Sequence, residues 1–379
     1  MNPPSRLPRS APRILVRGVN WLGDAVMSTP ALMRLRERFP EAQITLFTPE
    51  KLRELWLRHP AVNEVVSFAD GEGLISVGRR LKEGDFGLAV VLPNSPRSAL
   101  EVWLAQIPQR VGLARPWRNW FLTELVRERP GAVAMRKRSI AEIHALTSDK
   151  PGRPRSNIQY PASAHHLHHY LHLVAALGAN PEPLAPRLVV WDDEVTAVRK
   201  KLDLEEASVG GRLLFALNPG AEYGPAKRWP VERFIEAARR IQQRTNCVWL
   251  VLGGRGDVAL ANQIVSALRA PPAAVRTLAG QTTLRELMAL LKLCRGLLTN
   301  DTGPMHVAAA LGTPVVVPFG STSPELTGPG LPGDPGVQVL KSDAPCAPCF
   351  LRECPIDFRC MSGISVERVV EAMFRAAVG

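Results

Sequence analysis

Short apolar segments alternate with helical patterns along the whole chain. In the first half, such segments predict strands at residues 13–17, 43–47, 62–66 and 88–92. Between them, apolar residues at helical spacing predict helices at residues 25–39, 52–57 and 74–81. Strands that are apolar on both faces are typical of parallel sheets covered by helices on each side. The first half is therefore expected to be an α/β domain of the doubly wound, Rossmann-like type.

The second half repeats this alternation. Strands are expected at residues 213–217, 248–252, 296–299 and 315–317, and helices at 231–244, 258–268, 284–291 and 306–311. With 379 residues, two domains of ordinary size are expected. A proline-rich stretch, residues 178–186, follows a helix at 164–177, so we place the domain boundary at 180/181. The last helix, 366–378, is expected to pack back on the first domain, and the two domains to face a cleft.

Composition limits the class of protein. Hydrophobic residues make up 46% of the chain and charged residues 22%, which is ordinary for a globular protein. Residues 1–12 lack the apolar segment of a signal peptide, so we expect a cytoplasmic protein. Residues 1–190 hold 26 Lys and Arg against 16 Asp and Glu, whereas residues 191–379 hold 21 against 19. A basic first half would attract nucleic acid, an anionic membrane or an acidic substrate.

The first motif, Asn20-Trp-Leu-Gly-Asp24, follows the first strand. Ligands of open α/β sheets bind at the carboxyl edge of the strands, and Asp24 would place a carboxylate there. The alternative is that Asp24 only caps the next helix. The loop lacks the Gly-x-Gly-x-x-Gly pattern, so it gives poor support to a dinucleotide site.

The second motif runs from Asn218 to Pro230 and follows the first strand of the second domain. Lys227 and Arg228 would place cations at that sheet edge; the alternative is a solvated basic loop. A Gly-rich turn after the next strand contains Gly254, which would lie against the base or ribose of a nucleotide, although such turns are common.

The third motif begins at Thr299, where an apolar strand runs into a polar turn and an Ala-rich helix. The N-terminus of that helix is expected to bind an anion. Gly303 lets a phosphate approach the backbone, and His306 would donate to a phosphate oxygen. Asp301 or Thr302 would alternatively cap the helix, which is compatible with an anion site.

Two clusters suggest metal binding. Four cysteines near the end of the chain would form an all-thiolate structural zinc site, with packing of a loop as the alternative: Cys346, Cys349, Cys354 and Cys360. Four histidines share one helix face, but they lack an acidic neighbour, so we expect an exposed face rather than a metal site: His165, His168, His169 and His172.

Together, the three motifs resemble those of the heptosyltransferase family (glycosyltransferase family 9), and the second motif resembles the type II members. The resemblance implies a GT-B fold of two Rossmann-like domains. It also implies that Asp24 is the catalytic base and that Lys227 contacts the donor diphosphate. The resemblance further implies that the nucleotide and its phosphates are lined by Asp301, Thr302, Gly303 and His306.

By the same resemblance, the activity is an inverting transfer of L-glycero-D-manno-heptose from ADP-heptose to the inner core of lipopolysaccharide. A carboxylate accepts the proton of the attacking hydroxyl, and cations with a helix N-terminus offset the charge on departing ADP. Catalysis on these terms requires no cofactor. The acceptor would be Kdo-lipid A or its heptosylated form, which implies a peripheral protein on the anionic inner face of the inner membrane.

Basic residues of the first half are candidates for holding this acidic acceptor: Arg97, Arg136, Lys137 and Arg138. The alternative is a solvated basic face. A GT-B transferase with another donor and a sugar-nucleotide epimerase stay open, because fold alone does not separate them. Nucleic acid is not an expected partner, since no known binding module is present.

Overall fold

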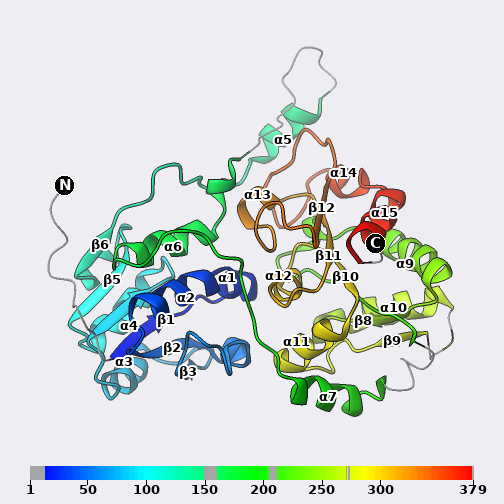
Figure 1. Cartoon of the computed structure of the whole chain (residues 1–379). Helices are drawn as coiled ribbons and strands as arrows, with labels where there is room; N and C mark the ends of the chain where they lie inside the picture. The colour runs from blue at the N-terminus through cyan, green and yellow to red at the C-terminus, as the bar shows by residue number, and fades with distance from the viewer. Residues whose placement is uncertain (1–12, 149–159, 205–210, 270, 272–273, 378–379) are drawn as a thin grey trace. The chain divides into compact units, whose positions relative to one another are not determined.

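The computed structural model describes residues 13–148, 160–204, 211–269, 271 and 274–377. The chain divides into two compact units (Figure 1). Unit 1 comprises residues 1–132 and 165–189, and unit 2 comprises residues 133–164 and 190–379. The boundary therefore lies at 189/190 rather than 180/181, and an inserted segment of the first half belongs to unit 2.

The proline-rich stretch that suggested a boundary is packed on unit 1. Arg34 donates through Nε to the carbonyl of Glu182 at 3.1 Å. The backbone N–H of Arg187 donates to Thr29 Oγ1 at the same distance. Because these contacts tie the stretch to helix α2 (Thr29–Arg38), it continues the first unit instead of linking the two units.

Unit 1 contains a six-stranded parallel sheet within its described residues, in the order β3-β2-β1-β4-β5-β6. The strands are β1 (Arg13–Arg17), β2 (Gln43–Pro49), β3 (Glu64–Phe68), β4 (Leu88–Val91), β5 (Gln109–Leu113) and β6 (Glu124–Val126). The sequence did not predict β5, which begins with two polar residues, or β6, which is three residues long. The strand order reverses between β1 and β4, which makes their carboxyl ends the topological switch point.

Helices cover both faces of this sheet. They are α1 (Leu22–Met27), α2, η1 (Glu50–Trp56), α3 (Leu74–Lys82), α4 (Pro96–Leu104), η2 (Asn119–Phe121) and α6 (Leu167–Ala175). The helix expected at 25–39 is two helices, because Ser28 and Thr29 bond the carbonyls of Ala25 and Val26. Helix α3 packs on α4, and α2 packs on α6.

Unit 2 repeats the topology. Its described residues form a six-stranded parallel sheet in the order β12-β11-β10-β7-β8-β9, so the switch point lies between β10 and β7. The strands are β7 (Leu214–Asn218), β8 (Val248–Val251), β9 (Val275–Thr277), β10 (Gly296–Thr299), β11 (Val315–Phe319) and β12 (Val337–Lys341). Two edge strands were not predicted from the sequence: β9, which has three residues, and β12, which has five.

Helices of unit 2 flank its sheet. Their bounds are α5 (Ile140–Thr147), η3 (Ala162–Ala164), α7 (Asp192–Lys201), η5 (Pro225–Lys227), α9 (Val231–Thr245), η6 (Arg255–Asp257), α10 (Val258–Leu268), α11 (Leu284–Leu293), α12 (Gly303–Ala310), α13 (Pro324–Thr327), α14 (Arg359–Ser362) and α15 (Val366–Ala377). The expected packing of the last helix on the first domain stays a prediction. Helix α15 packs on α9 and on β10, β11 and β12 of its own unit, because its apolar face completes the core there.

The division into units also changes the distribution of charge. Unit 1 holds 20 Lys and Arg against 14 Asp and Glu, and unit 2 holds 27 against 21. Each unit therefore carries a net charge of +6, and the basic first half is not a property of the folded units.

No helix of the described residues is long and apolar enough to cross a membrane.

Candidate active site

Asp24 lies at the switch point of unit 1. Strand β1 ends at Arg17, and the loop that follows is held by a hydrogen bond from the Gly18 N–H to the carbonyl of Phe47 at 2.8 Å. Asp24 is the third residue of α1, whose N-cap is Trp21. The alternative interpretation of Asp24 as a helix cap is therefore wrong. Its Oδ1 accepts a hydrogen bond from the Tyr170 hydroxyl at 3.2 Å.

Tyr170 of α6 and His166, the N-cap residue of that helix, interact with this carboxylate. Burial, together with the Asp24 charge, raises the pKa of Tyr170 well above its usual range. Burial lowers the pKa of His166, although the Asp24 carboxylate opposes that shift. Burial and the neighbouring His166 lower the pKa of His169 to about 4. A carboxylate that accepts from a neutral phenol is suited to receive a proton during a reaction.

The expected exposed histidine face is wrong. His165 is 1% exposed, and His168, His169 and His172 are partly buried. Sequence reasoning also missed Tyr170 as a partner of Asp24. Its apolar flanks signalled a buried helix face, but a contact across 146 residues of chain has no signal in the sequence.

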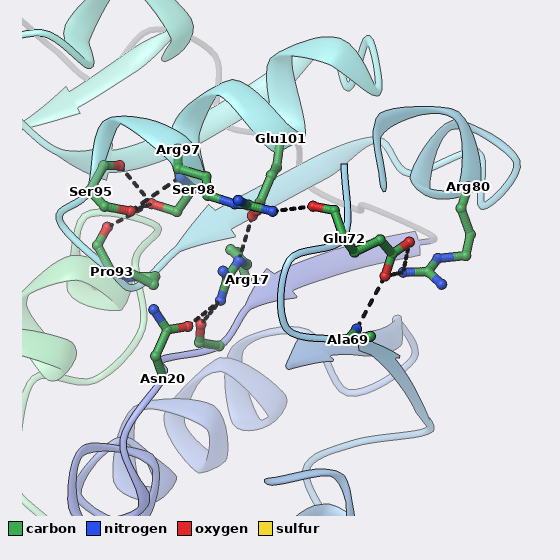
Figure 2. Close-up of polar contacts among 11 residues, drawn as sticks. Arg17, Asn20, Ala69, Glu72, Arg80, Pro93, Ser95, Arg97, Ser98 and Glu101 are labelled. Carbon is green, nitrogen blue, oxygen red and sulfur yellow. Dashed lines mark hydrogen bonds and ion pairs between the residues drawn. The ribbon is translucent and has the colours of Figure 1, made fainter. Parts of the chain in front are cut away.

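A buried ion pair supports the loop that leads to Asp24 (Figure 2). Arg17 Nε lies 2.7 Å from Glu101 Oε2, and the two residues are 2% and 0% exposed. Arg17 also donates through Nη1 to the carbonyl of Gly18 and to Asn20 Oδ1. Burial lowers the pKa of Arg17, and the Glu101 carboxylate opposes the shift. This arrangement links the end of β1 to α4 and fixes the start of the loop.

Arg97, a predicted acceptor contact, joins the same network. Its Nε lies 3.0 Å from Glu101 Oε1, and its Nη2 donates to the carbonyl of Glu72 (Figure 2). Its side chain is still 46% exposed and stands in the first turn of α4, which follows the carboxyl end of β4. Arg97 thus lies at the predicted edge of the sheet, but its charge is already partly balanced.

The other three predicted acceptor contacts belong to unit 2. Arg136 pairs with Glu142 at 2.6 Å, and Lys137 is exposed. Arg138 is 9% exposed, and its Nε donates to the carbonyl of Pro348 at 2.9 Å. Because the side chain of Arg138 packs against the loop that contains Pro348, its acceptor contact stays a prediction. The basic residues therefore do not form one patch on unit 1.

In unit 2, the second and third motifs meet at the switch point. Lys227 Nζ lies 2.6 Å from Asp301 Oδ2, and the two side chains are 13% and 5% exposed. Lys227 also lies 4.8 Å from the ring centroid of Tyr223. The Thr322 hydroxyl, which follows β11, donates to the same Oδ2 of Asp301. The sequence reasoning missed Tyr223 and Thr322, and the solvated-loop interpretation of Lys227 is wrong.

Asn300 joins the two motifs. Its Oδ1 accepts from the Trp229 N–H at 2.9 Å, and its Nδ2 donates to the carbonyl of Pro219 at 2.7 Å. Asn218 at the end of β7 donates to Thr299 Oγ1 at 3.1 Å. These buried bonds hold Lys227 and the start of α12 in one arrangement, so the predicted second and third motifs form one site.

Helix α12 begins at Gly303, after Thr302 as its N-cap. Thr302 therefore caps the helix by position, as one alternative predicted, although its side chain accepts no capping hydrogen bond among the described residues. His306 is 5% exposed, and its contact with a phosphate stays a prediction. The Gly254 N–H is engaged by Asp257 Oδ2 at 3.0 Å within its own turn, so its nucleotide contact also stays a prediction.

The cysteine-rich tail supports the Lys227 loop. The Tyr223 hydroxyl donates to the carbonyl of Phe350 at 2.8 Å, and the Ala226 N–H donates to the carbonyl of Arg352 at 2.9 Å. Gly224 has φ of +150°, and a Cβ there would lie 2.5 Å from the Arg352 carbonyl oxygen. The tail and the loop therefore pack backbone against backbone, which requires glycine at position 224.

The four cysteines of the tail lie near one another. Cys346 and Cys349 pack with Ile143 in an apolar cluster, and burial, followed by its cysteine neighbours, raises the pKa of Cys360 to about 12. Cys354 Sγ accepts from the Phe358 N–H. Among the described residues, no group of three or more His, Cys, Asp or Glu side chains is placed to hold a metal ion. These contacts support loop packing, and structural zinc stays a prediction.

A polar cavity adjoins the Lys227–Asp301 site. Its volume is about 360 Å³, and Thr322 and Ser323 line it together with Lys341 and Arg368. Thr322 also contacts Asp301, so this residue connects the cavity wall with the ion pair, although Lys227 and Asp301 do not themselves line the cavity. Unit 2 thus offers a cationic edge with adjacent space for a polar ligand.

The sequence matches glycosyltransferase family 9 (heptosyltransferase) over residues 74–358. That span includes the Lys227 and Asp301 motifs and most of both units. The chain belongs to glycosyltransferase family 9. This confirms the resemblance that the three motifs suggested, and it establishes the protein as a glycosyltransferase of the heptosyltransferase family.

Relatives of this family place the chain more closely. Lipopolysaccharide heptosyltransferase 2 of Salmonella typhimurium is 34% identical over 325 residues, covering 84% of this chain and 85% of the relative. Lipopolysaccharide heptosyltransferase 1 of Pseudomonas aeruginosa is 26% identical, covering 90% of this chain and 87% of the relative. The structure of E. coli ADP-heptose lps heptosyltransferase II has a TM-score of 0.75 at 28% identity, covering 97% and 98%. The predicted GT-B type fold is confirmed.

Proposed function

We propose that this family 9 member is a type II heptosyltransferase that transfers L-glycero-D-manno-heptose from ADP-heptose to the heptose/Kdo inner core of lipopolysaccharide. The observation that carries the proposal is the 34% identity to lipopolysaccharide heptosyltransferase 2 over 84% of the chain. The lower identity of 26% to the type 1 relative supports type II over type I. The geometry of the two switch points fits this reaction.

Unit 2 binds the donor. Departing ADP gains negative charge, and Lys227 with the N-terminus of α12 offsets it. Asp301 and Thr322 hold the ammonium group at the edge of the sheet, so that Lys227 needs little rearrangement during the reaction. Because these groups supply the stabilisation, the proposed mechanism uses no cofactor.

Unit 1 binds the acceptor and supplies the base. Asp24 accepts the proton of the acceptor hydroxyl as that hydroxyl attacks the anomeric carbon of heptose. The Tyr170 hydroxyl orients the carboxylate, and Arg17 with Glu101 fixes the loop before it. A single displacement by the hydroxyl, opposite the leaving ADP, inverts the anomeric centre.

The acceptor determines where the enzyme works. Kdo-lipid A that already carries one heptose is anchored in a membrane and bears phosphates and carboxylates. We therefore place the enzyme in the cytoplasm, peripheral on the inner face of the inner membrane.

The proposal is tested by measuring transfer from ADP-heptose to Kdo-lipid A with and without one heptose attached. Transfer only to the heptosylated acceptor is expected. Equal or exclusive transfer to the unheptosylated acceptor would contradict type II. Conversion of ADP-heptose in the absence of any acceptor would instead point to an epimerase.

A further inference from the structure

Three tryptophans of unit 1, one on α4 and two in the chain between β5 and β6, have exposed side chains. Trp117 is 83% exposed and Trp120 is 87% exposed, the two highest values among the large apolar side chains described. Trp103 on α4 is 45% exposed. By contrast, three tryptophans elsewhere are at most 2% exposed: Trp56, Trp229 and Trp249. Exposed aromatic clusters of this kind mark surfaces that bind a partner or a membrane.

The exposure of these tryptophans is built into the chain between β5 and β6. Arg118 is 0% exposed, and its Nη1 donates to the carbonyl of Pro93 at 2.6 Å. Leu122 is also buried, and Asn119 Oδ1 accepts from the Arg115 N–H at 2.9 Å. Because these neighbours fix the backbone, Trp117 and Trp120 are held outward in a defined conformation.

Helix α4 adds the third tryptophan. The ring of Trp103 packs edge-on against Phe121 with 5.8 Å between centroids, and Phe121 belongs to η2 with Trp120. The tryptophan surface, defined here as Trp103, Trp117 and Trp120, therefore comes from two adjoining elements of unit 1.

The charge of the surrounding segment complements an anionic surface. Residues 103–129 contain five arginines and two glutamates, but Arg118 is buried and Arg115 pairs with Glu128. The positive charge at the surface therefore comes mainly from Arg127, which is exposed, and Arg129, which is partly exposed. Tryptophan and arginine together are typical of protein segments at the headgroup level of a bilayer, where the indole is amphipathic and the guanidinium meets lipid phosphate.

The same segment is linked to the candidate base. Arg118 Nη1 also lies 3.4 Å from Asn94 Oδ1, and Asn94 Nδ2 lies 3.4 Å from His169 Nε2. His169 precedes Tyr170, whose hydroxyl contacts Asp24. The chain segment that carries Trp117 and Trp120 is therefore connected through its backbone neighbour Arg118 to the residues around the candidate base.

We propose that the tryptophan surface docks unit 1 on an anionic lipid bilayer by inserting its indole rings among the headgroups. This inference rests on the proposed function, because a lipid-anchored acceptor gives the docking its purpose. Trp117 and Trp120 contribute most because they are most exposed. Arg127 and Arg129 add attraction to lipid phosphate.

Vesicle co-sedimentation of the full chain tests the docking. The vesicles contain phosphatidylethanolamine and phosphatidylglycerol, and phosphatidylcholine vesicles serve as the neutral comparison. The double variant Trp117→Asn/Trp120→Ser is used, because Trp117 has a φ of +65° that asparagine tolerates. Trp191→Ala, at a residue of unit 2 that is 51% exposed, is the matched control.

We expect the wild type to sediment with the anionic vesicles, and the double variant to bind them roughly tenfold or more weakly. The control is expected to bind like the wild type. Unchanged thermal unfolding and ADP affinity of the double variant exclude misfolding as the cause. Equal vesicle binding by the double variant would overturn the proposal. Two other results for the double variant would also overturn it. One is that vesicle binding is retained while the protein changes from dimer to monomer, and the other is that only oligonucleotide binding is lost.

Turnover separates this proposal from the proposed function. The double variant is expected to lose activity on acceptor embedded in vesicles, but to keep it on an acceptor saccharide without acyl chains. If the wild type transfers heptose to neither acceptor, the proposed function fails while the sedimentation result stands on its own. Equal losses on both acceptors would overturn docking as the role of these tryptophans.

Discussion

The two units share one strand order, yet their switch-point aspartates have different surroundings. Asp24 in unit 1 accepts from the Tyr170 hydroxyl and lies near imidazoles whose pKa is lowered by burial. Asp301 in unit 2 is 5% exposed and pairs with Lys227 at 2.6 Å. Both aspartates lie at a switch point, but Asp24 follows the first strand of its unit and Asp301 follows the fourth. One carboxylate accepts from a phenol, and the other pairs with a lysine.

This difference indicates how a repeated fold divides the work of a transfer reaction. A base must change its protonation state during the reaction, and a neutral donor such as the Tyr170 hydroxyl permits that change. A group that positions a cation must keep its charge throughout the reaction. The topology supplies the place for each aspartate, and its immediate neighbours decide what it does.

Exchange of each aspartate for asparagine is the strongest test of the comparison. Asp24→Asn is expected to lower kcat by about a thousandfold, because the acceptor hydroxyl loses its base, while ADP affinity is unchanged. Asp301→Asn is expected to weaken ADP binding, because Lys227 loses its partner. Steady-state kinetics and calorimetric titration with ADP measure both effects. A weakened ADP affinity in Asp24→Asn with kcat retained would reverse the assignment.

Removal of the cation in unit 2 should have a somewhat smaller effect. Lys227→Met is expected to lower kcat/KM for the donor by about a hundredfold, since the charge on departing ADP is no longer offset. The matched control is Lys201→Met, whose side chain is 53% exposed and paired with Glu286. This control should change the kinetics by less than about twofold. Similar losses in both variants would mean that Lys227 acts only through the overall positive charge of the protein and not through its position at the site.

The stabilities of the two units should respond to opposite changes of pH. In unit 1, burial lowers the pKa of His59 from 6.5 to about 4, so the unfolded state binds more protons between these values. The contribution of neutral His59 to the free energy of unfolding is complete above pH 6.5. It is lost as the pH falls towards 4, and the loss amounts to at most about 3 kcal/mol. In unit 2, burial raises the pKa of Cys247 from 9.0 to about 11. The stability that its protonated thiol contributes is therefore lost as the pH rises from 9 towards 11.

Hydrogen exchange resolved by unit, at pH 5, 7 and 10, measures this difference. His59→Gln should reduce the acid sensitivity of unit 1, whereas the exposed His144→Gln serves as the control and should leave it unchanged. If both units lost protection together at pH 5, the buried histidine would not explain the acid response.

The smallest effect concerns the hydroxyl that contacts each aspartate. Tyr170→Phe removes a donor to the charged carboxylate, so the acidic limb of the kcat/KM profile should move to higher pH, with about a fivefold loss of rate at neutral pH. Thr322→Val removes the corresponding donor to Asp301, and we expect a higher donor KM with no change in the pH profile. Identical pH profiles for wild type and Tyr170→Phe would show that Tyr170 has only a structural role.

Much of the fold could be predicted because central parallel strands are continuous apolar runs. Strands β1, β2, β4, β7, β8, β10 and β11 lie at or close to their expected positions. Strands β6 and β9 have three residues each, and a short edge strand leaves little pattern to read. The domain boundary was misplaced because proline-rich composition suggested a linker, whereas Arg34 and Thr29 bind that stretch to unit 1.

The sequence by itself determined which loops carry charged groups at the sheet edges, because strand–loop–helix patterns place Asp24, Lys227 and Asp301 after apolar strands. Only the tertiary structure decided which of these charges are paired. Arg17 meets Glu101 across 84 residues, and Arg138 is buried against Pro348 across 210. Burial and ion pairing depend on distance in space, which residue order alone does not specify.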